Sequence, residues 1–140
     1  MTEQEIGKLI HDTAVADGMP PMLSNLIEAQ SKHETANYTS NAFINNHNCF
    51  GYKHVVGAHW QDGAGIISSE GDRYAHYENI ENSVHEICAW ILRRQKDGKF
   101  PRDLTAIGTP TDYAVLLKQA GYFGDPLQNY INGLTHYLIS

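Results

Sequence analysis

The chain has 140 residues, of which 41% are hydrophobic and 19% are charged, a composition typical of one globular domain with a real core. Ten basic against sixteen acidic residues give a net charge of −6, which argues against nucleic acid as a partner because such binding depends on neutralising phosphates. No stretch is apolar enough for the core of a signal peptide or for a membrane span. We therefore expect that the protein stays inside the cell, leaves it by another route, or is part of a longer chain.

Five segments carry apolar residues at helical spacing. The first begins with a capping-box pattern, Thr2 with Glu5, and ends before Gly18. The second begins at Pro20 and Pro21, because proline suits the first turn of a helix. The predicted helices cover about residues 2–17, 20–34, 82–97 (beginning at Asn82 or Ser83), 109–120 and 125–138.

The middle of the chain has a different character. Residues 37–48 are rich in Asn, Thr and Ser and predict a short helix or an ordered loop, with Phe43 and Ile44 as a buried anchor. Glycines then punctuate residues 50–77, where runs rich in Val, Ile and Tyr predict a small, irregular antiparallel sheet. Helices around one β lobe, at about residues 50–78, make a single α+β domain of residues 1–140 that is mostly helical.

Glu34 is the first candidate for chemistry. Leu23, Ile27, Gln30 and Glu34 follow one another at intervals of three or four residues, so they lie roughly along one face of the second helix. A stripe that begins apolar and ends in a carboxylate brings that group to the edge of the core, where desolvation raises its pKa. A general acid near neutral pH needs this property. The alternative is a solvated glutamate at a helix end.

Four short motifs resemble those of a known family. AQSKHETANY at 29–38 and NNHNCFGYK at 45–53 resemble the AQAxxES and NNLFGIK motifs of the bacterial glucosaminidases, glycoside hydrolase family 73. YAHYENIENS at 74–83 resembles the family's FRxY-then-ES segment, and GYFGDP at 121–126 resembles its GYATDP. The resemblance implies a lysozyme-like fold in which a helical domain and a small antiparallel β lobe line a substrate cleft. It also implies an endo-β-N-acetylglucosaminidase, a monomer acting on peptidoglycan glycan strands of the bacterial cell wall, extracellular or periplasmic.

The same resemblance implies the catalytic residues. Glu34 matches the family's acid, Glu70 occupies the place of its second carboxylate in the β lobe, and Tyr122 matches the tyrosine of GYATDP. The hairpin here is shorter than the family's, so Asp72 stays a rival to Glu70. Glu70 is alternatively a solvated hairpin residue, and Tyr122 a core tyrosine whose hydroxyl bonds to the backbone. Asp125, before a proline, is interpreted as a helix N-cap.

Five residues in or beside the β lobe are candidates for contact with the sugar. Asn48 either binds an acetamido group or holds the turn in which it lies. Aromatic faces stack on sugar rings, although a small sheet also needs aromatic packing for its own stability. The predicted substrate-binding residues are Asn48, Phe50, Tyr52, Trp60 and Tyr74.

Other kinds of function remain open. The histidines have no regular ligand spacing, and the His33-Glu34 pair lacks the second histidine of HExxH, so we expect no metal and no cofactor. A cysteine peptidase would use Cys49 with His85 or His76 as its base, but Cys49 occupies an apolar position of the motif, where a free cysteine behaves as a small hydrophobe. A glycan-binding module, a muramidase and a lytic transglycosylase on the same fold are further alternatives.

Overall fold

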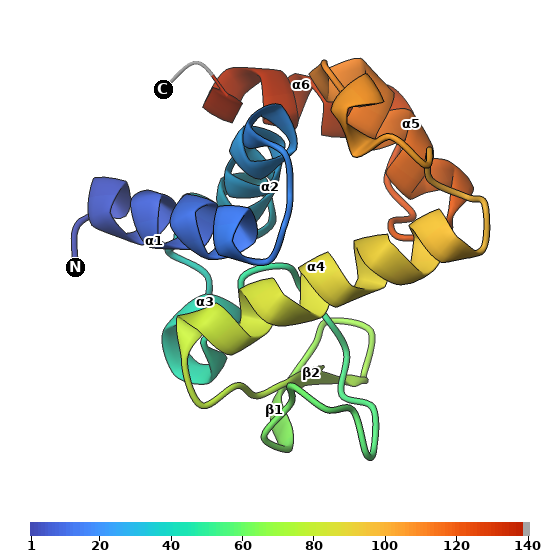
Figure 1. Ribbon diagram of the computed structural model, residues 1–140. Helices are drawn as coiled ribbons and strands as arrows, with labels where there is room; N and C mark the ends of the chain where they lie inside the picture. Colours follow the sequence, from blue (N-terminus) through green and yellow to red (C-terminus); the bar gives the residue numbers. More distant parts are fainter. Residues whose placement is uncertain (139–140) are drawn as a thin grey trace.

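The computed structural model describes residues 1–138, in which helices form most of the domain and a small two-stranded sheet lies at one side of it, next to α4 (Figure 1). This is the mostly helical α+β arrangement that the sequence predicts. The elements are α1 (Glu3–Ala16), α2 (Pro21–Glu34), α3 (Asn41–Asn46), β1 (Ala64–Ile67), β2 (Arg73–Ala75), α4 (Ile80–Lys96), the 3₁₀ helix η1 (Leu104–Ala106), α5 (Pro110–Gln119) and α6 (Leu127–Leu138). No helix within residues 1–138 is both long and apolar enough to cross a membrane.

The local signals at the start of the chain are confirmed. Thr2 and Glu5 form the predicted capping box: the Glu5 amide donates to Thr2 Oγ1 at 3.1 Å, and the Thr2 amide donates to Glu5 Oε1 at 2.8 Å. Pro21 is the first residue of α2 and Pro20 its N-cap residue. Helix α2 then packs against both α1 and α6, which makes it the central helix of the domain.

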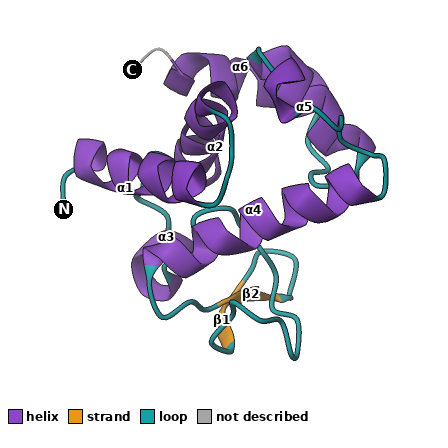
Figure 2. Cartoon of the chain, viewed as in Figure 1, coloured by secondary structure: helices purple, strands orange, loops and turns teal. Residues whose placement is uncertain are grey.

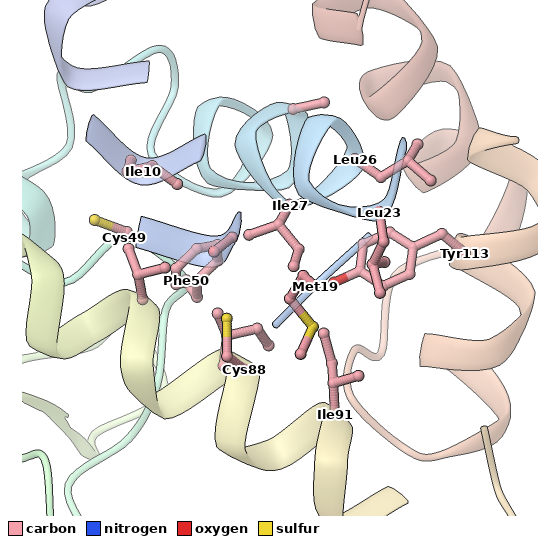
Figure 3. Close-up of a cluster of buried hydrophobic side chains, with 14 of the residues drawn as sticks. Ile10, Met19, Leu23, Leu26, Ile27, Cys49, Phe50, Cys88, Ile91 and Tyr113 are labelled. Carbon is pink, nitrogen blue, oxygen red and sulfur yellow. The ribbon is translucent and has the colours of Figure 1, made fainter. Parts of the chain in front are cut away.

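The apolar stripe of α2 forms the middle of the hydrophobic core (Figure 3). Leu23, Leu26 and Ile27 are completely buried, and they face residues from α4 and α5 such as Ile91 and Tyr113. Burial of an aliphatic side chain contributes about 1.5–3 kcal/mol. The packing of this stripe therefore fixes the direction in which the last turn of α2 points, and with it Glu34.

The β lobe lies on the other side of α4 from α5 and consists mostly of loops (Figure 2). Strands β1 and β2 pair antiparallel, with Ala64 opposite Ala75 and Ile67 opposite Arg73, and the register shifts between the two pairs. An isolated bridge joins Lys53 to Tyr74. The predicted sheet is confirmed, but it uses only a few of residues 50–77.

Two helix starts differ from the predicted ones. Helix α4 begins at Ile80, because the Asn79 side chain accepts a hydrogen bond from the Asn82 amide at 2.8 Å and caps the helix earlier than expected. Helix α6 begins at Leu127. The carbonyl of Pro126 accepts from the Tyr130 amide at 3.3 Å, so Pro126 holds the cap position and the interpretation of Asp125 as the N-cap is wrong.

The expected anchor of residues 37–48 is half correct. Phe43 is buried, whereas Ile44 is 60% exposed. Helix α3 is amphipathic and only six residues long, so adjacent residues face different sides and only one of the pair reaches the core.

Candidate active site

Glu34 is the last residue of α2 and lies half-buried at the edge of the core. Gln30, one turn earlier on the same face, is fully buried. Gly51 approaches the carboxyl group closely: a Cβ atom at this glycine would lie 3.9 Å from Glu34 Oε2. The motif carrying Gly51 thus meets the end of α2, as two motifs of one site should.

The surroundings of Glu34 favour its protonated form. Burial raises its pKa from 4.5 to about 8, and the negative charge of nearby Asp125 adds to the rise. The hydroxyl of Tyr130 partly offsets it. The raised pKa expected from the sequence is confirmed, and at neutral pH Glu34 holds the proton that a general acid must give.

Asp125 and Tyr130 are members of this site that sequence reasoning did not assign to it. Asp125 belongs to the GYFGDP motif, where the sequence predicts a helix cap, and Tyr130 lies on the inward stripe of α6. A DP pair before a helix indicates a cap as readily as a charged neighbour. Only the packing of α6 against α2 reveals that both residues act on Glu34.

Asn48 holds the turn rather than offering a free amide. Its Oδ1 accepts from the amides of Phe50, Gly51 and Tyr52 at 3.3, 2.9 and 3.2 Å. Its Nδ2 donates to the carbonyls of Tyr52 and Ala75 at 2.9 and 3.0 Å. The side chain is completely buried, so of the two roles left open by the sequence the turn-holding one applies, and the prediction of direct sugar contact is corrected.

Phe50 also faces inward. Its side chain is only 2% exposed and lies in the hydrophobic cluster (Figure 3), so its predicted contact with the substrate is wrong: the ring has no free face. The apolar position of the FGYK motif is a packing position. Its main-chain carbonyl, however, accepts a hydrogen bond from the Tyr122 hydroxyl at 2.8 Å.

Tyr122 contacts both the turn that carries Phe50 and Tyr52 and the helix α4. Its ring packs edge-on against Tyr52 and Trp90, with centroids 5.8 and 5.3 Å away. Burial raises the pKa of its phenol well above the usual value, so the hydroxyl stays protonated and donates to Phe50. The backbone-bonded arrangement left open by the sequence is the one observed, and a role in the chemistry stays a prediction.

The three remaining aromatic candidates are all partly exposed. Tyr52 packs on Tyr122, close to the motif around Gly51. Tyr74 lies on β2, and the Lys53 ammonium sits 4.3 Å from its ring centroid. Trp60 packs against His85 of α4. Contact of these three residues with the sugar stays a prediction.

Trp60 is held against α4. Its ring lies 4.6 Å from that of His59 and 4.7 Å from that of His85. His85 Nδ1 is in turn 2.6 Å from the carboxylate of Asp17, the C-cap residue of α1. The contact between Trp60 and His85 fastens the loop of the β lobe to α4, which gives Trp60 a structural role independent of any substrate.

Glu70 and Asp72 lie in the tight turn between β1 and β2. The Ser68 amide donates to the Asp72 carbonyl at 2.6 Å, the Gly71 amide donates to the Ser68 carbonyl at 3.1 Å, and Gly71 has φ +94°. Both acidic side chains are exposed. The acidic side chain whose charge acts on Glu34 is Asp125, so the predicted role of Glu70 as second catalytic group stays a prediction.

The two cysteines are free and buried. Burial raises the pKa of the Cys49 thiol to about 12, and that of Cys88 rises for the same reason. A nucleophilic cysteine needs a lowered pKa and access to its substrate. Neither cysteine meets these requirements, which removes the support for a Cys49 peptidase with His85 or His76.

Two surface hollows lie away from Glu34. One of about 550 Å³ is lined by polar residues of α1, α2 and α6, and one of about 440 Å³ by residues near η1 and α5. Within residues 1–138, no group of three or more His, Cys, Asp or Glu side chains could hold a metal ion. The desolvated carboxyl of Glu34, rather than the size of a hollow, therefore marks the candidate site.

A family comparison matches nearly the whole chain. The family described as glucosaminidase, mannosyl-glycoprotein endo-β-N-acetylglucosaminidase, matches residues 11–139. No curated protein sequence matches the chain.

Three solved structures share the fold. The glycoside hydrolase domain of FlgJ from Salmonella typhimurium has a TM-score of 0.66 at 22% identity, covering 99% of this chain and 87% of that one. A peptidoglycan hydrolase mutant from Sphingomonas sp. A1 has 0.63 at 18%, covering 98% and 93%. A type VI secretion system effector–immunity complex from Pseudomonas protegens has 0.63 at 15%, covering 99% and 92%. The lysozyme-like arrangement expected from the motifs is confirmed.

Proposed function

Because the chain belongs to the glucosaminidase family, we propose that it hydrolyses the glycan strands of peptidoglycan at N-acetylglucosamine linkages, with Glu34 as general acid. The observation that carries this proposal is the position of Glu34: its carboxyl group lies at the end of α2 beside Gly51, where burial raises its pKa to about 8. Peptidoglycan as the substrate is supported by the fold shared with FlgJ and with a peptidoglycan hydrolase.

Glu34 begins the reaction by giving its proton to the glycosidic oxygen of the leaving sugar. The bond from that oxygen to the anomeric carbon breaks, and positive charge develops on the sugar ring. Water then adds to the anomeric carbon, and the proton that the water loses restores the acid. A carboxyl that is still protonated at neutral pH suits the first step, because an ionised carboxylate has no proton to donate.

The second group that faces the anomeric carbon is proposed to be Glu70, which the β1–β2 turn exposes to solvent. Two carboxyl groups about 5–5.5 Å apart suit a retaining mechanism, and about 6.5–9.5 Å leaves room for water in an inverting one. Tyr122 is proposed to keep the Phe50–Gly51 backbone beside Glu34. Tyr52, Trp60 and Tyr74 are the proposed aromatic contacts of the sugar.

A lytic transglycosylase is the second candidate. It needs one acid and forms an anhydro product by internal attack instead of adding water. The observation that favours it is the identity of the acidic neighbour: Asp125 acts on Glu34, whereas Glu70 lies on an exposed turn of the other lobe. The products of the reaction distinguish the two functions.

The experiment is a digest of purified peptidoglycan with the products resolved by mass. Reducing N-acetylglucosamine ends support the proposal, anhydromuramic ends support the transglycosylase, and cleaved stem peptides exclude both. The same digest with Glu34→Gln should be slower by about 10²–10⁴-fold.

Glu28→Gln is the matched control, because Glu28 lies on the same helix but pairs with Lys32 at 3.2 Å. It should digest at the wild-type rate. A correctly folded Glu34→Gln protein that keeps the wild-type rate would show that Glu34 is not the acid. Since the proposed substrate is the cell wall, we propose that the chain acts outside the bacterial cytoplasm.

A further inference from the structure

A line of buried polar groups lies beneath Glu34. Gln30, one helical turn earlier, has no exposed surface, and its Oε1 accepts a hydrogen bond of 2.6 Å from the hydroxyl of Tyr113 on α5. A polar side chain in the centre of a hydrophobic core lowers stability unless its groups are paired. Because the oxygen of Gln30 is paired, the remaining question is which group pairs with its amide nitrogen.

Two buried polar atoms in this region have no hydrogen-bond partner in strict geometry among residues 1–138: Gln30 Nε2 and the hydroxyl of Tyr130. The large majority of buried polar atoms are paired, and these two have complementary chemistry. An amide nitrogen only donates, whereas a phenol accepts one hydrogen bond and donates another. Against the larger effect of burial, the Gln30 side chain acts to lower the pKa of Tyr130, and the Tyr130 hydroxyl acts to lower that of Glu34, so this hydroxyl lies near both side chains.

The ring of Tyr130 is held firmly in place. Phe123 stacks on it with a centroid distance of 3.9 Å and an interplanar angle of 6°, and His33 contacts it edge-on at 4.6 Å. Helices α2 and α6 approach closely beside it, since a Cβ atom at Gly133 would lie 2.0 Å from His33 Nδ1. A ring held by these two contacts keeps its hydroxyl near the last turn of α2.

We propose that Tyr130 is a positioning residue for Glu34, the last member of a chain in which Tyr113 donates to Gln30, Gln30 donates to Tyr130, and Tyr130 donates to the Glu34 carboxylate. This inference rests on the proposed role of Glu34. When Glu34 gives its proton to the glycosidic oxygen, the carboxylate left behind accepts the hydrogen bond of Tyr130, and the phenol keeps its own proton. This series of hydrogen bonds therefore stabilises the ionised form of Glu34 and fixes the orientation of its carboxyl group.

The other titratable groups near this point are Asp125, His33 and the phenols of Tyr113 and Tyr122, whose pKa values are raised chiefly by burial. The charge of Asp125 raises the pKa of Glu34. Burial lowers the pKa of His33, and Asp125 opposes that decrease. All four groups are unchanged in the variants below, so a difference in the Glu34 midpoint between variants results from the change at the Tyr130 hydroxyl.

The test is a ¹³C NMR titration of the Glu34 side-chain carboxyl carbon in the wild-type protein and in Tyr130→Phe. The wild-type signal should titrate near pH 8. Loss of a hydrogen bond to the carboxylate should move the midpoint upward by about one pH unit in Tyr130→Phe. An unchanged or lower midpoint in a folded variant overturns the proposal.

Tyr38→Phe is the matched control. The Tyr38 hydroxyl is also buried and lies 2.8 Å from Ser31 Oγ on the same helix α2, so this variant loses a comparable hydrogen bond elsewhere. Its Glu34 midpoint should equal that of the wild type. A second variant carries 3-fluorotyrosine in place of Tyr130, introduced at that position alone. A fluorinated phenol is a stronger donor of nearly the same shape, so the midpoint should move downward, and a midpoint that stays or rises overturns the proposal.

Rates measured in parallel separate this inference from the proposed function. In Tyr130→Phe the alkaline limb of the pH–rate profile should move upward together with the NMR midpoint. If the wild-type protein cleaves no glycan although the Glu34 titration midpoints move as expected, the proposed function fails. The proposed hydrogen bonds from Tyr113 to Glu34 are then still supported. If the protein cleaves glycan and the Glu34 midpoints do not move, the proposed hydrogen bonds from Tyr113 to Glu34 are refuted and the proposed function is still supported.

Discussion

The hydroxyl of Tyr122 donates a hydrogen bond of 2.8 Å to the carbonyl oxygen of Phe50. This bond joins the loop between α5 and α6 to the turn that follows α3, two segments 72 residues apart in the sequence. Gly51, the next residue in that turn, lies against the Glu34 carboxyl. The backbone beside Glu34 is therefore held from two sides, by Asn48 within the turn and by Tyr122 across the domain.

We expect Tyr122→Phe to lower both stability and activity. The loss of one hydrogen bond costs about 1 kcal/mol, measured by denaturant unfolding. Activity on peptidoglycan should fall further than this loss explains, because the Phe50–Gly51 backbone is released beside the acid. Tyr38→Phe, which also removes a buried hydroxyl pair, should lower stability alone. Equal activity of the two variants would contradict the positioning role.

The helices could be predicted because their signals are local. The apolar stripe of α2 and the capping box of Thr2 and Glu5 depend on residues three or four positions apart, and the structure contains both. The raised pKa of Glu34 followed from the same stripe, since an apolar face continuing into a carboxylate already implies desolvation.

The charged surroundings of Glu34 could not be predicted, because they come from Asp125, in the loop just before α6 and about ninety residues later. Whether Asp125 caps a helix or faces a carboxyl depends on how α6 packs on α2, which no local pattern encodes. The choice between two roles for Asn48, and the inward position of Phe50, could not be predicted for a related reason. A conspicuous motif in a loop identifies residues that matter, but only the three-dimensional packing separates those that hold the turn from those that contact a ligand.

Glu34→Gln should change how stability depends on pH. The folded-state pKa, about 8, exceeds the ordinary 4.5, so between these values the folded protein binds more protons than the unfolded chain. The stability of the wild type therefore falls as pH rises through this window, by up to about 1.4 kcal/mol per pH unit. Glutamine has no such penalty, so the variant should gain stability over the wild type toward pH 8. Unfolding curves measured at both ends of the window check this, and a constant difference would contradict it.

Asp125→Asn should lower the pKa of Glu34. The variant removes the negative charge that adds to burial in raising that pKa. Glu34 would then lose its proton at lower pH, so the alkaline limb of the pH–rate profile should move downward and activity at pH 8 should fall more than activity at pH 6. Asp12→Asn, an exposed residue paired with Lys8, is the control and should leave the profile in place. A profile of Asp125→Asn that matches the control would show that Asp125 does not act on the acid.

Cys49→Ala should keep most of the activity. The side chain is fully buried, and the raised pKa of its thiol keeps it protonated at neutral pH. We expect a packing loss of about 1 kcal/mol, seen as a shift of the denaturation midpoint. Thiol-alkylating reagents should leave Cys49 unmodified in the folded protein. Inactivation of a stable Cys49→Ala protein, with peptide products in place of glycan products, would restore the peptidase alternative.

The hairpin between β1 and β2 gives the most demanding prediction. Its turn is closed by hydrogen bonds between Ser68 and both Gly71 and Asp72, so Glu70 and Asp72 are two residues apart on one short connection. Removing the charge from either one alters the local field similarly, and a purely electrostatic contribution would affect both variants alike. A residue that contacts the anomeric carbon or the attacking water must instead occupy one particular position, so only one of the two variants should lose activity.

We therefore expect Glu70→Gln to slow glycan cleavage by at least about 10²-fold and Asp72→Asn to digest peptidoglycan close to the wild-type rate. Both side chains are exposed, so neither substitution should alter stability, and unfolding curves serve as the control. If Asp72→Asn is the inactive variant, the second group has been assigned two residues too early. If both variants cleave normally, no carboxyl of the hairpin takes part, and Glu34 then acts either with the acetamido group of the substrate or by the one-acid route that ends in an anhydro sugar. Product analysis of these same digests separates the two, because only the second route leaves anhydromuramic ends.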